Sequence, residues 1–214
     1  MGERKQDKLL NIKTVGIREW KDSKSQYNRY EATPYKALEV LCENYKFKDA
    51  YRVVDFGCGR GRVSFYLHNR FQIPVTGIEA NQKTYEEALE NKALYRAKAE
   101  HIPAPIEFNY GLAQHFKIDE KDNCFYFFHP FSVNIFRKVI NNILRSVEKH
   151  KRTVDLILYY PIREYRDFLK TSTPFEIINT MKVPGGTDKD EIVIIYRLRE
   201  EVLNEEEEDC LNIG

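Results

Sequence analysis

Short apolar runs alternate with amphipathic segments along most of the chain. Roughly four to eight apolar residues in a row predict a buried strand, and apolar residues that recur at helical spacing predict a helix. The apolar runs predict strands at 51–56, 73–78, 106–110, 124–129 and 154–160. The helix-favouring segments lie between them, from Thr33-Pro34 onward and at 62–70, 81–99, 135–147 and 165–169. Strands that alternate with helices indicate a parallel sheet covered on both faces.

The C-terminal part of the pattern differs, because two strand-like segments follow each other directly. Residues 175–183 and 192–198 flank the turn residues 184–187, which predicts a hairpin that adds an antiparallel strand to the sheet. Helix starts are also marked in the sequence. Asn81 is the expected N-cap of the helix at 81–99, and Thr33 is expected to cap the first helix with Pro34 in its first turn.

The same pattern divides the chain into three parts. Residues 1–32 form an N-terminal arm, polar and weakly patterned up to about Lys24, which is expected to become ordered only by docking. Residues 33–200 form one ligand-binding domain, which agrees with a length of 214 residues. Residues 201–214 contain the acidic run 205–209 and are expected to form a solvated, flexible tail.

Composition narrows the possible functions. The formal net charge is +1, which indicates no general affinity for nucleic acid. Four widely spaced cysteines indicate neither a metal cluster nor a disulfide framework. The first residues lack the apolar run of a signal peptide, and no stretch approaches membrane-spanning length, so a cytoplasmic location without membrane contact is expected.

A glycine loop at the end of the first predicted strand is the strongest chemical signal. Asp55 is followed by Gly57, Gly59 and Gly61, which allow a tight turn and close approach of a ligand to the backbone. A dinucleotide-binding loop would have a further glycine where Arg62 stands, so a nicotinamide-dependent oxidoreductase is disfavoured. An acid at position 55 would also repel a pyrophosphate but could hold an ammonium group.

A second acid, Glu79, ends the next predicted strand. A carboxylate there can accept hydrogen bonds from both hydroxyls of a ribose. With Asp55, it describes a ligand that has an amino-acid end and a ribose but no pyrophosphate, as in S-adenosylmethionine. The alternative without a ligand is that the glycines only form the turn between strand and helix, and that Glu79 is a solvated residue at the end of its strand.

From about residue 30 to 198 the sequence resembles the class I S-adenosylmethionine-dependent methyltransferases. The resemblance rests on V-V-D-F-G-C-G-R-G at 53–61, on the acid in G-I-E-A at 77–80 and on the closing hairpin. It implies a Rossmann-like α/β fold: three layers, doubly wound, with a mostly parallel seven-stranded sheet and a C-terminal antiparallel hairpin. It also implies S-adenosyl-L-methionine as cofactor, bound by Asp55, Gly57, Cys58, Gly59, Gly61, Glu79 and Ala80. The segment 111–113 looks like the family element beside the adenine, with Leu112 in place of the usual acid and the amide of Ala113 still able to serve.

The end of the fourth predicted strand is the expected acceptor site. Phe128-His129-Pro130-Phe131 is similar to the N-P-P-Y/F element of amino-group methyltransferases, but His129 stands where the asparagine would be. A neutral imidazole could orient the acceptor or act as a base, so His129, Pro130 and Tyr160 are the catalytic candidates. Equally, His129 could be bonded to backbone, and Tyr160 could be core.

A tyrosine-rich segment at 27–35 precedes the first predicted helix. It resembles a segment that folds over the cofactor in some methyltransferases, which adds Thr33 and Tyr35 to the cofactor candidates. The alternative is that Thr33 only caps the helix and the tyrosines pack. Residues 20–30 could also contact the acceptor.

The resulting hypothesis is a methyltransferase whose acceptor is unidentified, with an amino group among the candidates. The acceptor could be a small molecule, a protein or an RNA. The alternative is a module that binds the nucleoside ligand and catalyses nothing, because Leu112 and His129 both depart from the family pattern.

Overall fold

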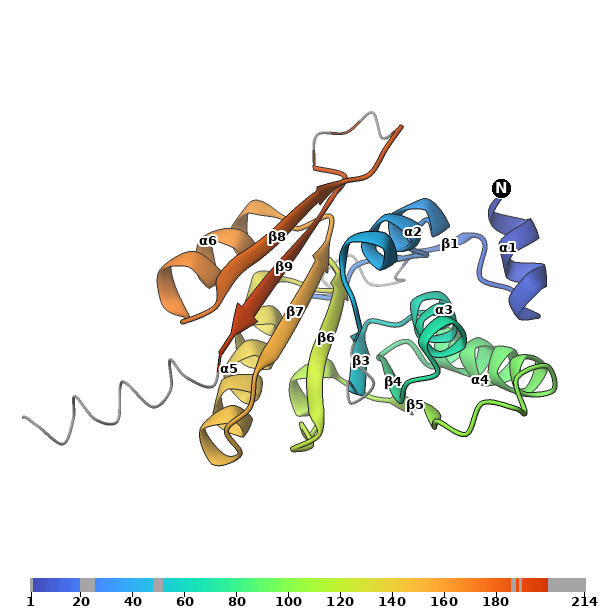
Figure 1. Ribbon diagram of the computed structural model, residues 1–214, viewed down its shortest axis with the longest axis horizontal. Helices are drawn as coiled ribbons and strands as arrows, with labels where there is room; N and C mark the ends of the chain where they lie inside the picture. The colour runs from blue at the N-terminus through green and yellow to red at the C-terminus, as the bar shows by residue number, and fades with distance from the viewer. Residues whose placement is uncertain (1, 20–25, 48–51, 186–187, 189, 200–214) are drawn as a thin grey trace, which may run out of the picture.

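A seven-stranded mixed sheet forms the centre of the molecule in a computed structural model, which describes residues 2–19, 26–47, 52–185, 188 and 190–199 (Figure 1). The strand order is β5-β4-β3-β6-β7-β9-β8. The first five strands of the sheet in chain order run parallel: β3 (Arg52–Phe56), β4 (Val75–Glu79), β5 (Ile106–Tyr110), β6 (Asp122–Phe128) and β7 (Val154–Tyr159). The hairpin of β8 (Glu176–Lys182) and β9 (Ile192–Leu198) adds the antiparallel β9 beside β7. The predicted fold class is therefore confirmed.

Helices cover both faces of this sheet, as alternating side chains along the strands require. Val53 belongs to one buried cluster and Val54 to the other. The first cluster includes side chains of α2 (Tyr35–Asn44), α3 (Arg62–Phe71) and α4 (Gln82–Arg96). The second includes those of α5 (Val133–Lys149) and α6 (Arg163–Ser172). Asp55 shares the parity of Val53 and therefore faces α3.

The predicted helix starts are right at one position and wrong at another. The side chain of Asn81 accepts a hydrogen bond from the Thr84 N–H at 3.0 Å, which confirms it as the N-cap of α4. Thr33 does not cap α2, because Pro34 takes the cap position without a side-chain hydrogen bond. Thr33 is buried, and its hydroxyl is hydrogen-bonded to the Tyr126 hydroxyl at 3.0 Å instead.

The N-terminal arm contains structure that its polar pattern did not predict. Helix α1 (Glu3–Leu10) docks against α3, and β1 (Ile17–Arg18) pairs with β2 (Tyr30–Glu31) in a separate two-stranded sheet. Buried Arg62 ties the arm down, donating to the Thr14 hydroxyl at 2.7 Å and the Thr33 carbonyl at 3.1 Å and pairing with Glu3. These contacts hold the described residues of the arm against α3.

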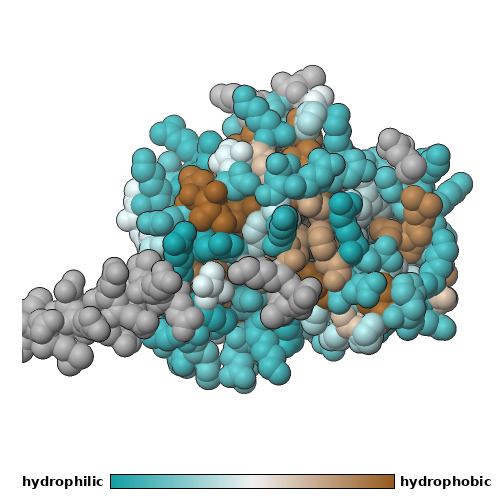
Figure 2. Space-filling model, viewed as in Figure 1, coloured by the Kyte–Doolittle hydropathy of each residue, from teal (hydrophilic) through white to brown (hydrophobic). Residues whose placement is uncertain are grey.

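The surface seen in Figure 2 is mostly hydrophilic, with apolar side chains gathered in separate patches, one of them over the region of β8 and α6. Within the described part of the chain, no helix is both long and apolar enough to cross a membrane. The predicted tail at 201–214 and the turn residues 186–187 lie outside the described residues.

Candidate functional site

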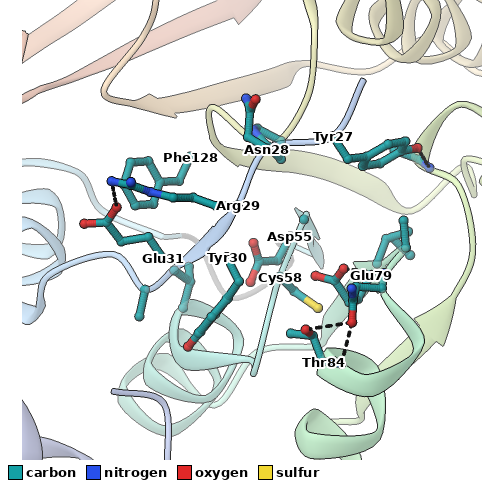
Figure 3. A pocket seen from close by; sticks show the side chains of 18 of the residues that line it. Tyr27, Asn28, Arg29, Tyr30, Glu31, Asp55, Cys58, Glu79, Thr84 and Phe128 are labelled. Carbon is teal, nitrogen blue, oxygen red and sulfur yellow. Dashed lines mark hydrogen bonds and ion pairs between the residues drawn. The ribbon is translucent and has the colours of Figure 1, made fainter. Parts of the chain in front are cut away.

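A small cavity, the first pocket, lies where the parallel strands end and is covered by the arm (Figure 3). Its volume is about 50 Å³. The predicted site residues that line it are Thr33, Asp55, Gly57, Cys58, Glu79, Ala80, Ala113 and Pro130. They come from four strand ends and the arm, and they meet because parallel strands end at the same edge of a sheet.

The other predicted residues lie elsewhere. Gly59 and Gly61 are not among the residues that line the first pocket. Tyr35 points toward α1, where its hydroxyl donates to Asp7 Oδ1 at 2.7 Å. His129 and Tyr160 line a neighbouring cavity, the second pocket.

The glycine loop makes room for protein side chains. A Cβ on Gly57 would lie 2.3 Å from Pro130 Cβ, and one on Gly59 would lie 2.2 Å from the ring of Tyr30. Both glycines also have positive φ, at 74° and 57°, which disfavours any other residue. The expected reason, close approach of a ligand, is therefore incomplete, because Pro130 and Tyr30 already pack on the loop.

Asp55 is a buried acid at the centre of the first pocket, with an exposed fraction of 2%. The Ser64 hydroxyl donates to Asp55 Oδ2 at 2.8 Å. Burial raises the pKa of Asp55 to about 7, and the nearby charge of Glu79 acts in the same direction, while the Ser64 hydrogen bonds oppose them. A ligand cation beside Asp55 would favour the ionised form.

Glu79 is held in place by backbone amides. The Gly59 N–H donates to Oε2 at 2.9 Å and the Asn81 N–H to Oε1 at 2.7 Å. Burial raises the pKa of Glu79, and these amide hydrogen bonds oppose the rise. A carboxylate has roughly four acceptor positions. Glu79 therefore keeps acceptor capacity toward the pocket while its orientation is fixed.

Two tyrosines of the arm lie over these groups. The Tyr27 hydroxyl donates to Gln114 Oε1 at 2.8 Å and accepts from the Ala113 N–H at 3.1 Å. The amide expected to serve an adenine is thus paired with Tyr27. Tyr30 packs on Gly59, beneath the Arg60 guanidinium at 4.8 Å from its ring centroid.

Asn28 joins the arm to the end of β6. Its Nδ2 donates to the His129 carbonyl at 2.7 Å, and its backbone N–H donates to the Pro130 carbonyl at 3.0 Å. Asn28 lines both pockets, as do Arg29, Glu31 and Phe128. The junction between the pockets is therefore built from the arm and the end of β6.

The second pocket has a volume of about 620 Å³ and opens beside the ends of β6 and β7. Its lining includes the predicted His129 and Tyr160, whose φ angles are 38° and 51°. The other non-glycine residues with positive φ in the described ranges, Asn11 and Gln72, are helix C-caps. Strained backbone away from helix ends is typical of functional sites, with a cost of roughly 1–3 kcal/mol per residue.

The side chains of these two residues differ in setting. Burial lowers the pKa of His129, which Glu164 partly opposes, so the imidazole is neutral at neutral pH. The Tyr160 hydroxyl donates to Asp188, and this hydrogen bond raises the pKa of Tyr160. His129 can therefore accept a proton or a hydrogen bond, while Tyr160 keeps its proton.

Sequence reasoning missed several residues that line the first pocket. Arg18 and Thr84 gave no signal, because a lone arginine in the arm and a threonine inside a helix are common. Asn28, Arg29 and Glu31 fall in the tyrosine-rich segment, whose density of charge was the available signal. Of the residues 20–30 expected to contact an acceptor, 20–25 lie outside the described residues.

The fold is Rossmann-like, and the first pocket lies at the carboxyl ends of its parallel strands, where open α/β sheets bind their ligands. Residues 32–122 match a family model described as "Methyltransferase domain". Over these residues, which are less than half of the chain, the sequence is similar to methyltransferase domains, and this agrees with the resemblance found in the sequence.

Two solved structures share the fold at low sequence identity. A putative RNA methyltransferase from Pyrococcus horikoshii is 17% identical, with a TM-score of 0.54, 92% of this chain and 97% of that chain covered. The tRNA (uracil-54, C5)-methyltransferase of Pyrococcus abyssi, in complex with S-adenosyl-L-homocysteine, is 13% identical, with a TM-score of 0.52 and coverages of 77% and 38%. At such identities the likeness concerns the fold.

A curated relative matches over a shorter stretch. The cyclopropane-fatty-acyl-phospholipid synthase of Escherichia coli (strain K12) is 28% identical over 71 residues. These residues are 33% of this chain and only 18% of the relative. The match therefore covers a small part of that enzyme.

Proposed function

We propose that the protein is a methyltransferase that uses S-adenosylmethionine in the first pocket and holds its acceptor in the second. The pair of buried carboxylates, Asp55 and Glu79, carries the proposal. Buried acids with raised pKa values are costly unless a ligand supplies a cation or hydrogen-bond donors. S-adenosylmethionine supplies both, as an ammonium group and a ribose diol.

The residues of the first pocket fit this cofactor. Asp55 would hold the ammonium group and Glu79 the ribose hydroxyls, with Ala80 and Ala113 beside the adenine. Gly57 and Cys58 line the same pocket as the two acids. When bound, S-adenosylmethionine supplies an electrophilic methyl group on a positively charged sulfur.

The arm has to shift for the cofactor to enter. Pockets for molecules of this size have volumes of roughly 300–1,000 Å³, whereas the first pocket has about 50 Å³. Tyr27 and Tyr30 occupy the space beside Ala113 and Gly59. We infer that the arm opens to admit the cofactor and then closes over it, excluding water.

The protein contributes mainly by alignment, because transfer of a methyl group needs the acceptor's lone pair in line with the bond that breaks. His129 would orient the acceptor or take its proton, and Tyr160 would form part of the acceptor wall. Pro130 packs on Gly57 and fixes the loop between the two pockets.

Methyl-labelled S-adenosylmethionine, incubated with the protein and fractionated cell extract, tests the proposal. One fraction should become labelled with the wild-type protein and with Glu107→Gln, a control on the exposed side of β5. Glu79→Gln should abolish labelling. The amide oxygen of glutamine can still accept a hydrogen bond from the Gly59 or Asn81 N–H, but the amide group cannot accept from both ribose hydroxyls as a carboxylate does. Full labelling by Glu79→Gln would contradict the assigned site.

A module that binds the cofactor without catalysis is the second candidate. It is favoured by two departures from the family pattern: His129 in place of asparagine, and Leu112, which is 41% exposed, in place of an acid. Binding of S-adenosylhomocysteine without labelling of any fraction would select this candidate.

A further inference from the structure

The second pocket has the charge and the walls of a site for an organic cation. We propose that the acceptor carries an ammonium group, recognised there by carboxylates and aromatic faces; this inference rests on the proposed function. A volume of about 620 Å³ suits a small molecule or a single extended side chain.

Acidic residues outnumber basic ones in this pocket. Among the residues that the structure describes, Glu19, Glu31 and Glu191 line it together with one cation, Arg29. Arg29 is itself paired, at 3.0 Å with Glu31 and 3.6 Å with Glu19 (Figure 3 shows the pair with Glu31). The formal charge of the lining is thus −2, and the positive charge of Arg29 is already matched. A cationic group is attracted to such a surface, and an anion is repelled.

Aromatic rings form the wall between the strand ends. Phe128 and Tyr159 have ring centroids 4.6 Å apart, and Tyr159 and Tyr160 have centroids 6.4 Å apart. The Tyr159 hydroxyl donates to Glu191 Oε1 at 3.1 Å, which joins the aromatic wall to a carboxylate. Aromatic faces beside carboxylates are a common arrangement for binding alkylammonium groups, since the ring quadrupole attracts a cation.

A phosphate-bearing acceptor fits this end of the molecule poorly. A separate cavity beside the start of β6 is richer in cations. The exposed Lys117, Lys121, Arg145 and Lys149 line it together with the half-buried Arg52, which pairs with Asp119 of the same lining.

An ammonium acceptor must lose one proton before its nitrogen can accept the methyl group. The ammonium loses a proton, and neutral His129 is placed to accept it. The nitrogen lone pair then forms the N–C bond while the C–S bond breaks and its electron pair stays on sulfur. The products are a methylated ammonium ion and neutral-sulfur S-adenosylhomocysteine.

Binding of matched probes to the full chain tests the inference. Phenethylamine and 3-phenylpropionate have the same ring and similar length but opposite charge. With saturating S-adenosylhomocysteine, calorimetry or NMR titration should detect the amine and give at least tenfold weaker binding for the carboxylate. Glu191→Gln, which keeps the acceptor for Tyr159, should weaken the amine about 3- to 10-fold, and Glu107→Gln should not.

The outcomes separate this inference from the proposed function. If S-adenosylhomocysteine binds but the two probes bind equally, or the carboxylate binds more tightly, the inference is overturned while the cofactor site stands. If S-adenosylhomocysteine itself does not bind, the proposed function fails first. Comparing methyl transfer to pooled small amines with transfer to a lysine-containing peptide shows whether the amine belongs to a small molecule or to a protein. Labelling of RNA alone would overturn the inference.

Discussion

Replacing Asp55 with asparagine is expected to change stability in opposite directions at acid and alkaline pH. Without a ligand, burial raises the pKa of Asp55 from 3.8 to about 7. A raised carboxyl pKa means that stability is lost as pH rises from about 4 to 7, by about 4 kcal/mol at roughly 1.4 kcal/mol per unit. Asparagine avoids this loss but buries an N–H that costs about 1–3 kcal/mol if unpaired.

The Asp55→Asn protein should therefore be about 2 kcal/mol more stable than wild type at pH 8 and about 1–3 kcal/mol less stable at about pH 3.5, below the pKa of an unfolded aspartate, from the two costs given above. Urea unfolding without cofactor measures both differences. Asp167→Asn, on the exposed face of α6, is the matched control and should change little at either pH. A variant less stable than wild type at both pH values would refute the reasoning. Independently, the variant should lose S-adenosylhomocysteine binding, because it cannot pair with the ammonium group.

Three further substitutions test the arm and the loop. Gly59→Ala should lower the melting temperature by about 4–16 °C, since a left-handed alanine and a Cβ 2.2 Å from Tyr30 cost roughly 2–4 kcal/mol, whereas Gly2→Ala, with open space around it, should not. Arg62→Gln should release the arm, so that trypsin cleaves it within minutes. If the arm is cleaved no faster than in the control Arg163→Gln, which changes an exposed arginine, the contacts of Arg62 do not hold the arm. Tyr27→Phe removes the hydroxyl that pairs with the Ala113 N–H, which destabilises the ligand-free arrangement in which Tyr27 occupies this amide. S-adenosylhomocysteine binding should therefore tighten by about 2- to 5-fold, while weaker binding would show that Tyr27 is needed by the ligand.

The sheet was predictable because its signals are local. Residues 106–110 and 192–198 were predicted with the bounds that the structure shows, since apolar runs between turn residues define strands directly. Asn81 was predictable as a cap for the same reason. Helix α1 was not predictable, because its packing relies on Arg62, which lies in a distant part of the chain and pairs with Glu3 and Asp7.

The residues of the first pocket were predicted more completely than those of the N-terminal arm that covers it. Asp55 and Glu79 end neighbouring strands, so the chain order alone brings them to one edge. Tyr35 was expected at the pocket, but the first turn of α2 directs it toward Asp7. Asn28 was not singled out within the range 20–30 expected to contact the acceptor, because nothing in its local sequence indicates a hydrogen bond to the carbonyl of His129, about a hundred positions away.

Calorimetric titration of S-adenosylhomocysteine into the unmodified protein at pH 6 and pH 8 tests the central claim most directly. Because Asp55 is mostly protonated at pH 6 and must ionise to hold the ligand's ammonium group, binding should release close to one proton at pH 6 and much less at pH 8. The affinity should be micromolar at pH 8 and about tenfold weaker at pH 6. No binding, or binding with neither proton release nor pH dependence, would contradict the assignment of Asp55 and the first pocket.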